Sequence, residues 1–227
     1  MNLSKIFRKI KIYHNLYIKE KIYIKRKSYS MDKEDIEICK FFKNKKNGFY
    51  VDVGSFHPTR LSNTYFLYKL GWRGINIDPS EYSIALFNYL RKEDINICKA
   101  ASIETGLKKF YYQKEFSPLS TLDLNTAKKR FQGKVKEKLV NCDTLKNIID
   151  STKYKNQTID FLNIDTEGKD IDALKSLNIQ LYKPKLVCVE DFKPNIKYDE
   201  ISAFEILKSY KYEHFWSGVY SHIFFKR

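Results

Sequence analysis

Acidic side chains end four of the strands that the sequence predicts. Asp52 and Asp78 each follow an apolar run, and Asp165 and the Glu190–Asp191 pair follow two later runs. In an open parallel sheet, ligands bind outside the carboxyl ends of the strands. One carboxylate at such a place can simply cap the next helix, whereas four at equivalent places predict a cleft lined with acids.

The turn after the first strand favours a ligand with a cationic part over a pyrophosphate. It carries one glycine, Gly54, whereas a dinucleotide site uses G-x-G-x-x-G, so an NAD-dependent sugar oxidoreductase is disfavoured. An acid inside the turn would repel a pyrophosphate but suits S-adenosylmethionine, which has an ammonium, a sulfonium and an uncharged ribose. We therefore expect Asp52 and Gly54 beside the methionine part, Asp78 on the ribose hydroxyls and residues 99–101 beside the adenine.

Three segments resemble a known family, the FkbM-type S-adenosylmethionine-dependent O-methyltransferases. They are YVDVG at 50–54, GWRGINIDPS at 71–80 and IDFLNIDTEGKDIDALKS at 159–176, and the resemblance extends over residues 47–191. Details such as VDVGSFHP and SNT are similar to a subgroup found near surface-polysaccharide genes. The resemblance implies a hydroxyl of a sugar or nucleotide-sugar as methyl acceptor. The cofactor contacts that we predict are Asp52, Gly54, Ser55, Asn63, Asp78 and Ala101.

Methyl transfer is an in-line displacement, so the enzyme must align donor and acceptor and take up the hydroxyl proton. His57 follows the cofactor turn and can serve as the base; alternatively, it shapes the turn before Pro58 or contacts the methionine. Asp165 and Glu167 are the other catalytic candidates, because they can hydrogen-bond sugar hydroxyls. A further alternative is that Glu167 only favours the dipole of the next helix.

A divalent metal is a second hypothesis for the acids. In a related branch of this fold, acids after the fourth and fifth strands hold a metal that binds two substrate oxygens. Asp165, Glu190 and Asp191 occupy comparable places here. Their carboxylates suit Mg²⁺, which would lower the pKa of the hydroxyl without a strong base.

The elements that must position these residues alternate between strands and helices. We expect strands at 49–53, 74–78 and 95–102, with helices at 61–71 and 80–92 between them. Short connections predict right-handed crossovers and a parallel sheet. Residues 104–141 interrupt this order, and we expect an insertion whose loop 117–123 covers the acceptor.

The later segments complete the predicted fold. Strands are expected at 159–165 and 185–191, a helix at 199–210, and a β-hairpin at the end of the chain. The pattern predicts the class I methyltransferase (Rossmann-like) fold, an α/β, doubly wound, mostly parallel seven-stranded sheet with a C-terminal antiparallel hairpin.

Positive charge is concentrated in residues 1–30, which we separate from the domain at 31–227. This segment holds nine Lys or Arg residues and one Glu, a net +8 of the chain's +15. As an amphipathic helix it can lie on an anionic membrane. It can also dock on the domain, on a partner subunit or on a glycosyltransferase, or be flexible; we favour docking or flexibility over membrane contact.

The charge also admits an alternative function, a nucleic-acid-binding or RNA-modifying protein with a methyltransferase fold. Nucleic-acid amino-methyltransferases typically carry a [DN]PP[YFW]-like tetrapeptide where this chain has IDTE, whose two acids would repel phosphates, so no nucleic acid is expected.

The four cysteines have no disulfide or zinc spacing, and no apolar run approaches the ~20 residues of a membrane span. We therefore expect a cytoplasmic protein, which can also lie at the inner face of the membrane. The sequence also allows a homo-oligomer.

Overall fold

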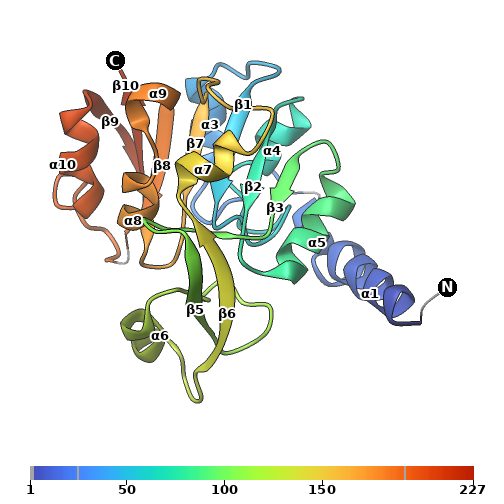
Figure 1. Cartoon of the computed structure of the whole chain (residues 1–227). Coiled ribbons are helices and arrows are strands. Elements are labelled where there is room, and N and C mark those ends of the chain that lie inside the picture. The colour runs from blue at the N-terminus through green and yellow to red at the C-terminus, as the bar shows by residue number, and fades with distance from the viewer. Residues whose placement is uncertain (1–2, 25, 192) are drawn as a thin grey trace.

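The computed structural model describes residues 3–24, 26–191 and 193–227. Seven strands form the main sheet in the order β3-β2-β1-β7-β8-β10-β9 (Figure 1). The first five are parallel, and β10 is antiparallel to both β8 and β9. This confirms the predicted fold class, including its antiparallel hairpin. The strands are β1 (Phe49–Val53), β2 (Arg73–Ile77), β3 (Ile95–Ile97), β7 (Phe161–Ile164), β8 (Leu186–Glu190), β9 (Tyr212–Ser217) and β10 (Ser221–Lys226).

Helices cover both faces of this sheet, which explains why every residue of β1 is buried. On one face, Tyr50, Phe161 and Leu186 pack with residues of α3 and α4. On the other, Val51 and Val187 pack with residues of α7 to α10. The helices are α3 (Glu34–Phe41), α4 (Tyr65–Lys69), α5 (Glu81–Leu90), α7 (Leu145–Asp150), α8 (Asp170–Lys175), α9 (Ile179–Tyr182) and α10 (Ser202–Ser209).

The predicted insertion forms an arm with its own three-stranded sheet, which projects below the main sheet (Figure 1). It is built from β4 (Ala100–Ala101), β5 (Gly106–Tyr112), α6 (Leu124–Arg130) and β6 (Lys136–Asp143). The single strand expected at 95–102 is therefore divided, because β3 pairs with β2 whereas β4 pairs with β6. Lys99, at the break, forms an ion pair of 2.9 Å with Asp143 of β6, which holds the chain in the second sheet.

The N-terminal segment packs against α5. It consists of α1 (Leu3–His14), a π-helical turn η1 (Asn15–Lys19) and α2 (Lys21–Ile24). Ile12 and Leu16 are buried against Leu86 of α5. Within the described part of the chain, no helix is both long and apolar enough to cross a membrane.

A fully buried arginine joins the loop after β1 to α5. Arg91 donates hydrogen bonds to the carbonyl oxygen of Pro58 and to the hydroxyls of Ser62 and Thr64, the latter two at 2.8 Å. Thr64 in turn donates to Asp52 at 2.6 Å. An unpaired buried charge is very costly, so these partners and the loop that carries them must adopt one arrangement.

We predict that Arg91→Met destabilises the protein by about 3–5 kcal/mol, because it leaves the buried Asp52 carboxylate without a compensating charge. Denaturant unfolding measures the loss. The control is Arg227→Met, since the Arg227 side chain is 82% exposed and its pair with Glu213 lies at the surface. The control should change stability by less than about 1 kcal/mol. Equal losses in the two variants would contradict the role given to Arg91.

Candidate functional site

A pocket opens at the carboxyl ends of β1, β2 and β7, next to the base of the arm. Gly54 lines it with φ +77, in the left-handed region that favours glycine. A Cβ on Gly54 would lie 1.6 Å from the carbonyl oxygen of Asp165, so only glycine fits this close approach. The lining includes Gly54, Phe56, Asp78, Pro79, Ser80, Lys99, Ala100, Ala101, Phe110, Leu122, Asp165 and Glu167.

Asp78 lies in the wall of this pocket with a fixed carboxylate. Its two oxygens accept hydrogen bonds from the backbone N–H groups of Phe56 at 2.9 Å and Ser80 at 2.7 Å. Burial raises the pKa of Asp78 to about 6, against the opposing effect of these bonds. The remaining lone pairs of a carboxylate held in this way suit a pair of hydroxyl groups. Of the other predicted cofactor contacts, Ala101 also lines the pocket.

Asp52 and Ser55 do not line the pocket. Asp52 is buried and accepts hydrogen bonds from Thr64 and from the amide of Asn163, at 2.6 and 2.9 Å. The backbone N–H of Ser55 donates to the carbonyl of Ile77. Both residues therefore hold the turn around Gly54, and of the three predicted contacts Asp52, Gly54 and Ser55 only Gly54 lines the pocket.

A second pocket adjoins the first. Gly54, Phe56, Pro118, Asp165 and Glu167 line both. The predicted residue Asn63 lies in the second pocket, where its amide donates to Asn163 Oδ1 at 2.9 Å. Three polar residues complete this wall, namely Glu34, Glu190 and Ser221. The second pocket, which Asp78 does not line, is thus rich in hydrogen-bonding groups.

His57 is fully buried and has partners at both ring nitrogens. Its Nε2 bonds Asn15 Oδ1 at 2.9 Å, and its Nδ1 accepts from the backbone N–H groups of Thr59 and Arg60. These contacts fix a neutral imidazole that is protonated at Nε2. Burial is the main reason that the pKa of His57 falls to about 3, and nearby cations lower it further. The geometry therefore supports the turn-shaping alternative for His57 and not the general base.

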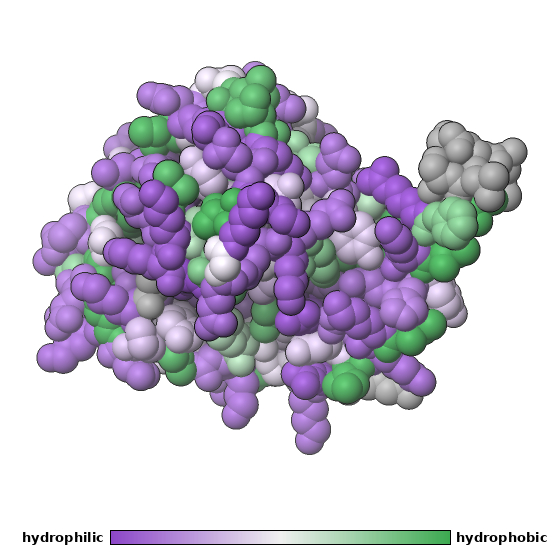
Figure 2. Space-filling view, turned by 90° about the horizontal axis from the view of Figure 1, so that it is seen from below, coloured by the Kyte–Doolittle hydropathy of each residue, from purple (hydrophilic) through white to green (hydrophobic). Residues whose placement is uncertain are grey.

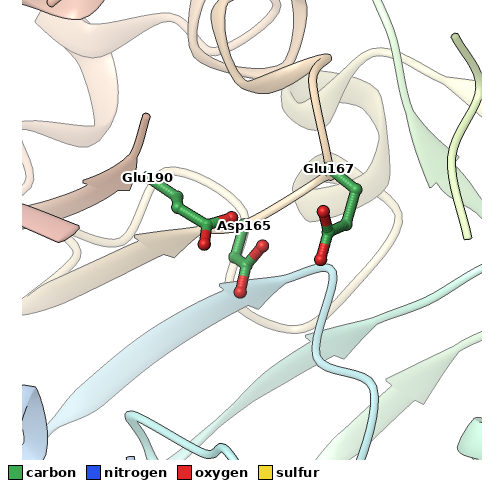
Figure 3. A group of neighbouring side chains, drawn as sticks. All are labelled: Asp165, Glu167 and Glu190. Carbon is green, nitrogen blue, oxygen red and sulfur yellow. The ribbon is translucent and has the colours of Figure 1, made fainter. Parts of the chain in front are cut away.

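Three carboxylates converge where the two pockets meet. Asp165, Glu167 and Glu190 each offer an oxygen within 4.8 Å of the others, and their side chains point toward one another (Figure 3). Asp191, predicted as a metal ligand, is not part of this cluster, and its Oδ1 accepts from the backbone N–H of Lys193. Glu167 takes its place because the chain turns back after β7.

The turn that follows Asp165 explains how Glu167 reaches the cluster. Glu167 and Gly168 have φ values of +55 and +101, and the carboxylate of Asp170 accepts from the backbone N–H groups of Thr166 and Gly168. This cap reverses the chain, so Asp165 and Glu167 both face the pockets. Arg130 of α6 forms an ion pair with Glu167. No sequence pattern points to Arg130, which lies in a KKR run of the kind found on solvated surfaces.

Burial and mutual repulsion raise the pKa values of these acids. Burial first, and the neighbouring Glu190 charge second, hold the pKa of Asp165 well above its usual range. Burial also raises the pKa of Glu190, and it raises that of Glu167 to about 8. Within the described residues, Asp165 Oδ1 and Glu190 Oε2 are buried without a hydrogen-bond partner. The cluster is therefore short of positive charge or protons at neutral pH.

The loop before Leu122 closes over the pockets. Phe116 stacks on Phe56 with ring centroids 4.6 Å apart, and Thr121 donates to the carbonyl oxygen of Glu167. Pro118, in the loop 117–123, lines both pockets. Glu115 also lines the first pocket. No sequence pattern points to Glu115 or Phe116, because isolated residues in an insertion carry no recognisable spacing.

Comparison with known proteins assigns a family to residues 52–213, which match the model of the methyltransferase FkbM domain. Among solved structures, the methyltransferase FkbM from Methylobacillus flagellatus KT aligns with a TM-score of 0.49 at 14% identity, covering 98% of this chain and 60% of that one. A TehB-like SAM-dependent methyltransferase from Corynebacterium glutamicum ATCC 13032 Kitasato aligns with a TM-score of 0.47 at 9% identity, covering 95% of this chain and 96% of that one. None of the curated proteins searched matches.

The acid cluster predicts a pH-dependent stability. Acids whose pKa is raised by folding stabilise the protein below their unfolded pKa, and this contribution is lost as pH rises through the folded pKa, about 8 for Glu167. In EDTA, Glu190→Gln should therefore raise the melting temperature at pH 8 by about 2–4 °C, or about 1 kcal/mol. At pH 5 the gain should be smaller, because the wild-type cluster there holds protons. A gain that is larger at pH 5 would contradict this account.

Proposed function

Because this chain belongs to the FkbM methyltransferase family, whose members use S-adenosylmethionine, we propose that it transfers a methyl group to a hydroxyl of a sugar or nucleotide-sugar. One observation carries the proposal: the pocket that contains Asp78 and the polar pocket that contains Asn63 share Asp165 and Glu167. A methyl donor in the first pocket and a hydroxyl in the second would meet beside these two carboxylates.

The first pocket suits S-adenosylmethionine along its length. Asp78 would accept hydrogen bonds from the ribose hydroxyls, and the apolar walls of Ala101, Phe110 and Leu122 would hold the adenine. At the other end, the acid cluster would attract the ammonium and sulfonium charges. Gly54 would lie beside the methionine part, and the absence of a Cβ there lets the turn after β1 approach the carbonyl oxygen of Asp165.

The second pocket suits a hydroxyl-rich acceptor. Asn63, Glu34, Glu190 and Ser221 offer amide, carboxylate and hydroxyl groups, and such groups select a substrate by hydrogen bonds. Asp165 would take up the proton of the attacking hydroxyl, since its raised pKa makes it a stronger base than an ordinary carboxylate. The family resemblance of the sequence extends this proposal to surface-polysaccharide precursors. A cytoplasmic location remains a prediction.

The residues present also fit a divalent cation as a second way of neutralising the cluster. The ligands would be Asp165, Glu167 and Glu190, whose hard oxygens suit Mg²⁺ and include two buried oxygens without partners in the described chain. When bound, the cation would lower the pKa of the acceptor hydroxyl. Full activity after exhaustive chelation with EDTA would exclude this form of the site, and activity lost to EDTA and restored by Mg²⁺ would support it.

We predict that Asp78→Asn weakens S-adenosylmethionine binding about tenfold, because it removes a charged hydrogen-bond acceptor from the ribose hydroxyls. Isothermal titration calorimetry measures the affinity. Asp172→Asn is the matched control, since the Asp172 side chain is 34% exposed and pairs with Lys169 on α8. A wild-type protein that does not bind S-adenosylmethionine would refute the cofactor assignment.

We predict that Asp165→Asn lowers methyl transfer by about 10²–10⁴-fold, the range lost with a general base. Products from a screen of nucleotide-activated sugars are identified by mass spectrometry. The wild-type rate should fall as pH drops through the raised pKa of the Asp165–Glu190 pair, because the base must be ionised. If Asp165→Asn keeps wild-type turnover and pH profile, another group takes up the proton.

A further inference from the structure

The N-terminal segment leaves an apolar and basic face uncovered. We propose that residues 6–23 form a surface that binds the anionic face of a lipid bilayer. The observations that carry this are the exposure of its large apolar side chains, the charge around them and the way in which the opposite face is docked on the domain.

Large apolar side chains are unusually exposed in this segment. Phe7, Ile10, Tyr13, Ile18 and Ile22 have exposed fractions of 60, 57, 53, 60 and 68%. They are five of the fifteen exposed large apolar side chains that the structure describes, within less than a tenth of the chain. Scattered exposed apolar residues need no explanation, but a group of this kind marks an interaction site.

Some of these residues share one face of α1. Phe7 and Ile10 have the spacing of a single face, which His14 continues, whereas Ile12 and Leu16 are buried on the docked face. Ile18 of η1 and Ile22 of α2 are exposed beyond the end of α1. Figure 2 shows apolar and hydrophilic side chains interleaved on the projecting N-terminal end at the right.

The charge around this face selects an anionic partner. The exposed basic side chains described between residues 6 and 27 are Arg8, Lys9, Lys11, Lys19, Lys21, Arg26 and Lys27. The only acid in the same stretch, Glu20, is buried and paired with Arg60 at 3.1 Å, so it does not offset them. Two exposed acids of the domain, Glu81 and Glu115, line the groove beside Phe7 and Ile10, and the seven basic side chains outnumber them. Apolar side chains bordered by Lys and Arg are the composition of helices that lie in the interface of an anionic bilayer.

The docked face makes this surface a fixed part of the domain. Asn15 bonds His57 of the cofactor turn, and Tyr82 donates to the carbonyl oxygen of Lys11. Phe7 and Ile10 line a groove between α1 and the domain, whose other wall includes Tyr82 and Glu115; Glu115 also lines the first pocket. Binding to a bilayer would therefore hold the entrance of the active site at a defined distance from the lipid surface.

Vesicle co-sedimentation of the full chain tests the proposal. Wild type should bind vesicles of phosphatidylcholine with about 30 mol% phosphatidylserine, bind pure phosphatidylcholine vesicles much more weakly, and dissociate in roughly 0.5 M NaCl. The double variant Phe7→Asp/Ile10→Asp should lose at least about tenfold in vesicle affinity. The matched control is Leu107→Asp/Leu139→Asp, because each of these leucines is 63% exposed on the arm; it should bind like wild type.

Folding and oligomeric state are checked on the same samples. Thermal melting and S-adenosylmethionine titration should be the same in wild type and in the Phe7/Ile10 variant, so a failure of the proposed methyl transfer would not affect this test. Two outcomes overturn the proposal. One is wild-type vesicle binding by the Phe7/Ile10 variant. The other is a wild-type dimer in light scattering that this variant converts to a monomer, without vesicle binding by either, since a second copy would then cover the face.

Discussion

The buried guanidinium of Arg91 is the constraint on which the rest of this site depends. A charge that is removed from water must be surrounded by acceptors, and here the acceptors come from the loop between β1 and α4. Through Thr64 the same group reaches Asp52, whose second oxygen accepts from Asn163 of β7. The loop that carries Gly54 is therefore held by Arg91 at the end of α5, by Asp52 of β1 and, through Asp52, by Asn163 of β7 before any cofactor binds.

The second group of buried charges is built in the opposite way. Asp165, Glu167 and Glu190 lie together with one arginine, Arg130, shown paired to Glu167, and two of their oxygens have no partner in the described part of the chain. A cluster of this kind costs stability, and folded proteins keep such costs where the charge is used. The network around Arg91, in which the charge has hydrogen-bond partners, holds the residues of the site in place. The cluster around Asp165, in which two oxygens have none in the described part of the chain, supplies the groups that can react.

The N-terminal segment connects this frame to the surface of the molecule. Its docked face reaches the cofactor turn through Asn15 and His57, so a helix that precedes the domain in sequence helps to shape the active site. Its other face is apolar, basic and uncovered. One segment can thus combine a structural contact with the turn and a contact outside the molecule, because a helix presents different residues to its two sides.

The order of apolar runs along the chain is enough to predict the sheet and the edge of it at which the site forms. Alternating apolar runs and helices specify parallel strands, and acids at the strand ends mark Asp78, Asp165 and Glu190 because packing gives no reason for a carboxylate there. Local patterns also located the insertion and its loop. They could not divide residues 95–102 between two sheets, since the pairing of β4 with β6 depends on residues some forty positions away.

Which polar residues face the pockets depends on contacts between distant segments and follows from the three-dimensional structure alone. Asp52 and Asp78 end neighbouring strands, yet Asp52 is buried in the Arg91 network and Asp78 faces the first pocket. His57 follows the cofactor turn, where a general base could lie, but both of its ring nitrogens are hydrogen-bonded to the protein. Glu167 replaces Asp191 in the cluster because Gly168 and Asp170 reverse the chain. The direction of a side chain is set by partners from distant segments, and a sequence pattern records neighbours along the chain, not neighbours in space.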